Sequence, residues 1–168
     1  MRCAINALLG HNSRCEHTSR IELILLRHFN PRKDMHFNFV DKVIEREPGR
    51  IVTIKAVTRS EEYLQDHFAT FPVLPGVFML ESLVQAGREL LRYEDKRCAR
   101  HVLGEAKAIR YASFVRPGET LRLTVSIQKE ASEEGGEYQL KGEATTERDG
   151  ETEICCSGRF TLRPVKLD

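Results

Sequence analysis

The sequence predicts an α+β domain in which a curved antiparallel sheet of about six strands wraps around one long helix. Val77 to Arg92 is an apolar stretch too long for an ordinary strand, so it predicts a mostly buried helix. Several shorter segments alternate apolar and polar residues between turn signals, which predicts strands joined as a meander. A sheet with one apolar face and a single apolar helix can bury each other.

Length and composition fit one globular domain with an N-terminal extension. The chain has 168 residues, enough for one hydrophobic core. Residues 1–34 show no clean period and contain the breaker Asn30-Pro31, so we interpret them as an extension of unknown role and place the domain in residues 35–168. Because 26 Lys and Arg nearly balance 25 Asp and Glu, no global charge favours nucleic acid or an anionic membrane surface.

Three further features favour a cytoplasmic protein. Apolar runs such as Val77 to Leu80 are far shorter than the roughly 18 residues of a membrane span, and no long apolar run resembles a signal peptide. The five cysteines are an odd number without CxxC spacing, which argues against a disulfide framework or a zinc site. We therefore expect reduced thiols, no membrane segment, and neither metal nor cofactor.

The predicted elements follow in a regular order. Two β-rich runs surround a Pro48-Gly49 turn, the helix follows Pro75-Gly76, and further turn signals separate three or four later strands. Apolar residues at every second position are expected to share one face of their strand. The two β-rich runs are Phe37–Glu47 and Ile51–Val57; the later turns are Arg116–Gly118, Glu133–Gly136 and Asp149-Gly150; the shared faces are Leu121, Leu123, Val125 and Ile127, then Ile154, Cys156, Phe160 and Leu162.

Residues suited to acid–base chemistry gather near the start of the predicted helix. His67 precedes the helix, Gly76 lies at its N-terminus, and Glu81 lies inside an otherwise apolar run. Helical spacing puts Glu81, Gln85 and Arg88 along one side. Each residue alone has an ordinary explanation, such as a loop histidine bonded to the backbone or a turn glycine. The apolar neighbours of Glu81 make a fully solvated position less favourable.

Together, residues 67–85 resemble the active-site segment of the 3-hydroxyacyl-[acyl-carrier-protein] dehydratases. That family's motif runs His-Phe-Pro-Gly, then Pro-Val-Met-Pro-Gly-Val, then a helix with Glu and Gln. Here Pro72-Val73-Leu74-Pro75-Gly76-Val77 matches the second part, and Glu81 follows His67 by fourteen residues, as in the family. The resemblance extends to Phe39–Val43 and Phe114–Glu119 and covers residues 36–162. It implies a hot-dog fold and a hydro-lyase.

The resemblance also implies a role for each residue. His67 would be the base that removes the α-proton of a 3-hydroxyacyl thioester, and Glu81 the acid that protonates the departing hydroxide, so its carboxyl must be held protonated. The Gly76 N–H would meet the enolate-like oxygen at the helix N-terminus. The remaining candidates for contacts with substrate are Val77, Gln85 and Phe71, with Val73, Leu74, Phe78 and Met79 as further lining of an acyl tunnel.

In that family the histidine and glutamate of one site come from two subunits. This implies a homodimer and allows a trimer of dimers. The substrate would arrive on an acyl carrier protein, whose acidity implies a basic rim around the entrance. Candidates for that rim are Arg97, Arg100, Lys107, Arg110 and Arg116.

The segment departs from the family at one place. His67-Phe68-Ala69-Thr70 replaces His-Phe-Pro-Gly, and Phe71 stands where histidine is common. A positive φ at Thr70 would strain a β-branched residue, so we expect a reshaped loop after His67. Two other functions stay open: a non-catalytic hot-dog protein that binds acyl carriers or scaffolds a synthase, and a hot-dog acyl thioesterase, which would need a carboxylate-activated water.

Overall fold

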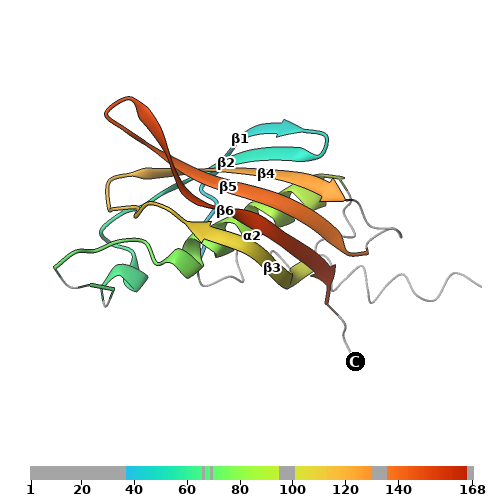
Figure 1. Ribbon diagram of the computed structural model, residues 1–168, viewed down its shortest axis with the longest axis horizontal. Helices are drawn as coiled ribbons and strands as arrows, with labels where there is room; N and C mark the ends of the chain where they lie inside the picture. Colours follow the sequence, from blue (N-terminus) through green and yellow to red (C-terminus); the bar gives the residue numbers. More distant parts are fainter. Residues whose placement is uncertain (1–36, 66, 69, 95–100, 130–135, 166–168) are drawn as a thin grey trace, which may run out of the picture. The chain divides into compact units, whose positions relative to one another are not determined.

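The computed structural model describes residues 37–65, 67–68, 70–94, 101–129 and 136–165, and the extension predicted at 1–34 lies outside them. In these ranges the chain forms six strands and one long helix (Figure 1). The elements are β1 (Lys42–Glu47), β2 (Arg50–Ala56), a 3₁₀ turn (Glu62–Leu64), α2 (Gly76–Glu94), β3 (His101–Tyr111), β4 (Thr120–Lys129), β5 (Tyr138–Arg148) and β6 (Glu151–Pro164).

The strands form one sheet in the order β1-β2-β4-β5-β6-β3, and all neighbours are antiparallel. Helix α2 runs along one face of this sheet and contacts every strand from β2 to β6 (Figure 1). Strands β1 and β3 are the two edges. The predicted α+β arrangement of one helix on a six-stranded antiparallel sheet is confirmed.

Local sequence signals produce most of these elements. Leu121, Leu123 and Val125 of β4 are all fully buried, as their alternation predicts. The β5–β6 turn has positive φ at both central residues, 51° at Asp149 and 82° at Gly150, which is the geometry that favours Asp-Gly in a two-residue hairpin. Because no other residue adopts positive φ as easily as glycine, Gly150 suits this position.

The prediction for β6 is wrong at one residue. Ile154 is 45% exposed, whereas Cys155 and Cys156 are both fully buried. The pairing with β5 shifts here: Ala144 pairs with Cys156, and the next residue, Thr145, pairs with Ile154. Cys155 is thus an extra residue in β6, and a β-bulge of this kind reverses the alternation of faces. Ile154 therefore lies on the opposite face from Phe160.

The helix lies unusually close to the sheet at two glycines. A Cβ on Gly142 of β5 would stand 3.0 Å from both methyl carbons of Leu83 in α2. A Cβ on Gly87 of α2 would stand 3.2 Å from a methyl carbon of Leu162 and 3.2 Å from the Phe160 ring. The glycines let the helix bury its apolar face directly against the strands. No helix in the described ranges has the length and apolar character that would let it cross a membrane.

Candidate active site

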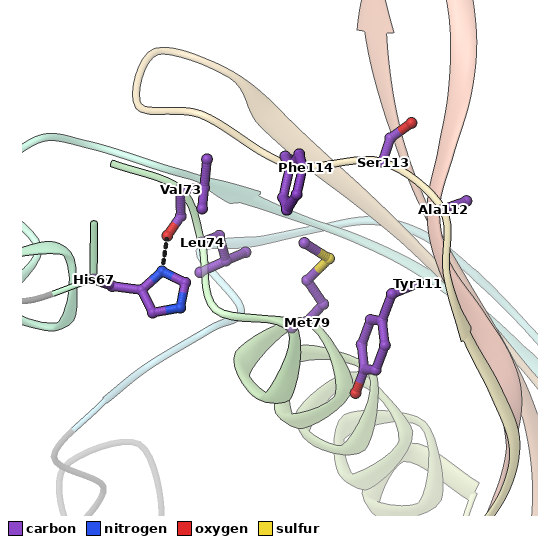
Figure 2. Close-up of a pocket in the computed structure, with 9 residues that line it drawn as sticks. His67, Val73, Leu74, Met79, Tyr111, Ala112, Ser113 and Phe114 are labelled. Carbon is purple, nitrogen blue, oxygen red and sulfur yellow. Dashed lines mark hydrogen bonds between the residues drawn. The ribbon is translucent and has the colours of Figure 1, made fainter. Parts of the chain in front are cut away.

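A cavity of about 250 Å³ lies between the segment that leads into α2 and the segment that follows β3 (Figure 2). Its lining is mostly apolar, which suits an acyl chain. It brings together two of the predicted site residues, His67 and Gly76. The full lining is His67, Val73, Leu74, Gly76, Met79, Tyr111, Ala112, Ser113 and Phe114.

His67 is oriented by the backbone just before the helix. Its Nδ1 lies 3.1 Å from the carbonyl oxygen of Val73 (Figure 2). A carbonyl can only accept a hydrogen bond, so the neutral ring that makes this contact carries its proton on Nδ1. Its Nε2 then keeps the lone pair. The ring is held in the tautomer that a general base requires.

Gly76 begins α2 and is in close contact with Tyr111 of β3. A Cβ at Gly76 would lie 3.1 to 3.4 Å from three carbons of the Tyr111 ring, so the ring packs where only a glycine leaves room. The first N–H groups of a helix lack intrahelical acceptors and suit a developing negative charge. Burial, and to a lesser degree the nearby Cys156, raise the pKa of Tyr111, which keeps its hydroxyl protonated at neutral pH.

Glu81 has polar neighbours, which differs from the apolar environment expected from its sequence context. Its Oε1 accepts a hydrogen bond from Gln85 Nε2 at 3.1 Å and lies 3.6 Å from Arg88 Nη1. The side chain is 34% exposed and is not part of the cavity lining. The helix turns the apolar sequence neighbours toward the sheet and leaves Glu81 beside the residues at i+4 and i+7.

Gln85 is buried, and both atoms of its side-chain amide form hydrogen bonds with other groups of the protein. Its Oε1 accepts from the Phe39 N–H at 2.9 Å, and its Nε2 donates to the Phe37 carbonyl oxygen at 3.2 Å as well as to Glu81. These contacts tie the segment before β1 to α2. Gln85 thus orients Glu81 in the single chain, and its role as a substrate-binding residue stays a prediction.

The remaining predicted lining residues divide into two groups. Val73, Leu74 and Met79 line the cavity, whereas Val77 is 66% exposed and outside it. Phe71 is also outside, with its ring centre 5.9 Å from that of Phe114, which does line the cavity. Phe78 instead belongs to an aromatic cluster of Phe37, Phe39, Tyr63 and Phe78, with its ring centre 4.9 Å from that of Tyr63.

Sequence reasoning missed the wall formed by residues 111–114. Tyr111 is the last residue of the irregular strand β3, and Ala112, Ser113 and Phe114 follow it without a periodic signal of their own. The Phe114–Glu119 match to the dehydratase family was the available clue, because it placed a family motif next to these residues.

The loop after His67 and the predicted basic rim have their own geometry. Phe68 has φ of 60°, a left-handed conformation that is uncommon for a bulky residue, so strain lies directly after the histidine. The guanidinium of Arg116 lies 5.0 Å above the Phe71 ring, while Lys107 pairs with Glu105 at 2.7 Å. Arg97 and Arg100 lie outside the described residues.

One helix on a six-stranded antiparallel sheet of this order, with a histidine in an apolar cavity at the helix N-terminus, defines a hot-dog-fold protein. Solved structures agree on the fold. The dehydratase heterocomplex ApeI:P from Xenorhabdus doucetiae matches with a TM-score of 0.62 at 18% identity, over 77% of this chain and 84% of that chain. Zebrafish thioesterase superfamily member 2 matches with a TM-score of 0.55 at 16% identity, over 74% and 80%. At these identities the likeness concerns the fold alone.

Sequence comparisons identify the family. The model of the ApeI-like dehydratases matches residues 43–159. The chain is 38% identical over 126 residues to the 3-hydroxyacyl-[acyl-carrier-protein] dehydratase FabZ of Lactobacillus helveticus, covering 74% of this chain and 80% of that relative. For the FabZ of Clostridium perfringens the identity is 39% over 125 residues, covering 74% and 85%. The chain belongs to this dehydratase family, which confirms the resemblance and the predicted class of enzyme, a hydro-lyase.

Proposed function

We propose that the chain removes water from a 3-hydroxyacyl thioester carried by an acyl carrier protein and forms the trans-2-enoyl thioester. The observation that carries the proposal is His67, which lines an apolar cavity at the N-terminus of α2 with its Nδ1 bound to a carbonyl. Elimination needs a base at the α-carbon, and Nε2 is the nitrogen available for that proton. The substrate class follows the names of the sequence relatives.

The remaining steps are assigned to α2. The Gly76 N–H would stabilise negative charge on the thioester oxygen as the α-proton leaves. Glu81 would supply the proton to the departing hydroxide, directly or through a water molecule. Gln85 would keep the Glu81 carboxyl in place.

We further propose that one site is shared between two copies of the chain. Glu81 is absent from the lining of the His67 cavity, so a single chain leaves base and acid in separate places. The edge strand β3 exposes residues 104–108 and ends at Tyr111, which is 52% exposed and lines the cavity. On its outer side β3 pairs with none of the described strands, and an edge of this length suits pairing with another strand. A homodimer through β3 would complete both the sheet and the site.

The direct test is to incubate the protein with a short 3-hydroxyacyl carrier-protein substrate and follow the conjugated enoyl product. His67→Ala and Glu81→Gln should each lower the rate by at least about a hundredfold, because each removes a proton-transfer group. Glu89→Gln, in the same helix, is the matched control and should retain activity. Release of free acid would support a thioesterase instead, and carrier binding without product would support a scaffold.

Mixing the two inactive variants tests the shared site. Random exchange of subunits makes about half the dimers mixed, and each mixed dimer has one intact site, so about one quarter of the activity should return. No recovery in an exchanged mixture would place both residues of a site in one chain. Size measurements on the protein alone would show whether the assembly is a dimer or larger. We expect the protein in the cytosol, where carrier-bound substrates are made.

A further inference from the structure

The cavity wall missed by sequence reasoning belongs to a connecting segment, residues 112–119, between β3 and β4. Backbone bonds hold its two ends. Ala112 N–H donates to the carbonyl of Cys155 at 2.9 Å, and Gly118 N–H donates to the carbonyl of Val57 at 2.8 Å. Between these ends lie Ser113 and Phe114, the two residues of the segment that line the cavity together with Ala112.

Arg148, the last residue of β5, donates hydrogen bonds to this segment at Phe114 and at its last residue, Glu119. Its Nε and Nη2 donate to the two carboxylate oxygens of Glu119 at 2.7 and 2.9 Å. Nη2 also donates to the carbonyl oxygen of Phe114, and Nη1 donates to Glu153 at 2.5 Å. Two parallel bonds to one carboxylate are the geometry that arginine makes best. The hydrogen bonds from Arg148 lower the pKa of Glu119, so the pair is ionised across the neutral range.

The same segment holds the backbone that orients His67. Leu74 N–H donates to the carbonyl oxygen of Val115 at 2.8 Å. The preceding residue, Val73, accepts the contact from His67 Nδ1 at 3.1 Å. A continuous series of bonds therefore joins the guanidinium of Arg148 to the imidazole of His67 through the backbone of Phe114, Val115, Leu74 and Val73.

We propose that Arg148 is a positioning residue of the active site. It fixes the wall formed by Ser113 and Phe114 and, through Val115, the backbone that holds His67 in its working orientation. The effect on catalysis rests on the proposed dehydratase function. The series of bonds from Arg148 to His67, here called the tether, rests only on the contacts of Arg148 and residues 73–119.

The competing explanation is an ordinary stabilising ion pair on the sheet. The chain offers an example for comparison in Arg122, whose Nη2 lies 2.9 Å from Glu45 Oε1 and whose side chain is 43% exposed. Among the described residues, the Arg122 side chain makes no hydrogen bond or ion pair with residues 112–119. The Arg148 side chain is 27% exposed and binds a backbone carbonyl of the cavity wall. Replacing each arginine in turn therefore distinguishes the loss of an ordinary ion pair from the loss of a contact that positions the cavity wall.

The experiment compares Arg148→Met, Arg148→Lys and the control Arg122→Met in two measurements. Hydrogen–deuterium exchange should be faster by about tenfold or more for the Leu74 amide in Arg148→Met, because the segment that binds it is released. The kcat with a 3-hydroxyacyl carrier-protein substrate should fall roughly 10- to 100-fold with a smaller change in KM, since a small misplacement of the base acts on the chemical step. Arg148→Lys should recover part of kcat, and Arg122→Met should match wild type in both measurements.

Unchanged exchange at Leu74 and unchanged kcat in Arg148→Met would overturn the proposal. So would equal losses in Arg148→Met and Arg122→Met, which would indicate general destabilisation. If wild type proves inactive as a dehydratase, hydrogen–deuterium exchange at the Leu74 amide still tests whether Arg148 holds the backbone next to His67. Glu119→Gln serves as the second variant if Arg148→Met does not fold. It keeps the side-chain size, weakens the pair with Arg148, and is expected to show the same faster exchange at Leu74.

Discussion

Replacing Gln85 with methionine should destabilise the fold and disturb the proposed acid together. Methionine has a similar length and flexibility, so it fills the site without leaving a large cavity. It removes the amide that bonds Phe39 N–H, the Phe37 carbonyl and Glu81. The substitution therefore isolates the hydrogen bonds from the packing.

The structure allows the cost to be estimated. Phe39 is 1% exposed, so its N–H would be left buried without an acceptor, which costs about 1–3 kcal/mol. Phe37 and Glu81 are both partly exposed, so the loss of their bonds adds only about 0.5–1 kcal/mol together. The sum is about 1.5–4 kcal/mol of unfolding free energy. For a domain of this size that corresponds to a fall in Tm of roughly 4–12 °C, at about 3 °C per kcal/mol.

Urea unfolding and turnover of the carrier substrate are the two assays. We expect kcat to fall as well, because Glu81 loses the amide that orients it. Gln128→Met is the matched control. Gln128 is exposed, and among the described residues its side-chain amide donates only to Ser126, at 3.3 Å, so its replacement should change stability by less than about 0.5 kcal/mol. A Gln85→Met protein as stable as the control would refute the reasoning, since it would mean that the Phe39 N–H finds another partner at no cost.

Three further predictions concern packing, pH and thiol reactivity. Gly142→Ala should cost about 1–3 kcal/mol in urea unfolding, because its Cβ would stand 3.0 Å from both Leu83 methyl carbons in a filled core; a neutral result would mean that α2 can move away from the sheet. The pKa of Glu119 is lowered mainly by hydrogen bonds from Arg148, so the stability that the Glu119 carboxylate contributes is complete above its unfolded pKa and is lost as pH falls through the lower folded pKa. Between pH 6 and pH 3 the free energy of unfolding should therefore fall less steeply in Glu119→Gln than in wild type. Equal slopes would contradict this prediction. Burial raises the pKa of Cys156 to about 11, so mass spectrometry should find it unalkylated by iodoacetamide at pH 7.5 until the protein is unfolded; rapid labelling of the native protein would contradict the burial.

The sequence was sufficient where local rules decide the structure. Regular alternation placed Leu121, Leu123 and Val125 in the core, and Asp149-Gly150 marked the hairpin turn. It was insufficient at β-bulges, because an inserted residue reverses the faces without any change in composition. Cys155 is such a residue, and it sends Ile154 to the exposed side.

Bulges also explain why the cavity wall was missed. The pairing of β3 with β6 shifts between Leu103 and Glu105 and again between Lys107 and Arg110, with φ of 52° at Ala108. Gly158 of β6 permits the second shift, since a Cβ there would stand 2.4 Å from the Ile109 side chain. A strand that shifts twice has no single alternation, so the place of Tyr111 in the cavity lining could not be predicted by counting along β3.

For Glu81 the helical period was the reliable guide, and the surrounding composition was misleading. The spacing of Glu81, Gln85 and Arg88 predicted that they share one side, and the structure confirms it with contacts of 3.1 and 3.6 Å. The apolar residues next to Glu81 in sequence, Leu83 and Val84 among them, face the core and do not enclose the carboxyl. Among the described residues the Glu81 side chain stays 34% exposed, whereas an acid that works in a water-poor site needs groups that enclose it. The shared site proposed here supplies them, because a second copy would bring its His67 cavity to the exposed side of Glu81.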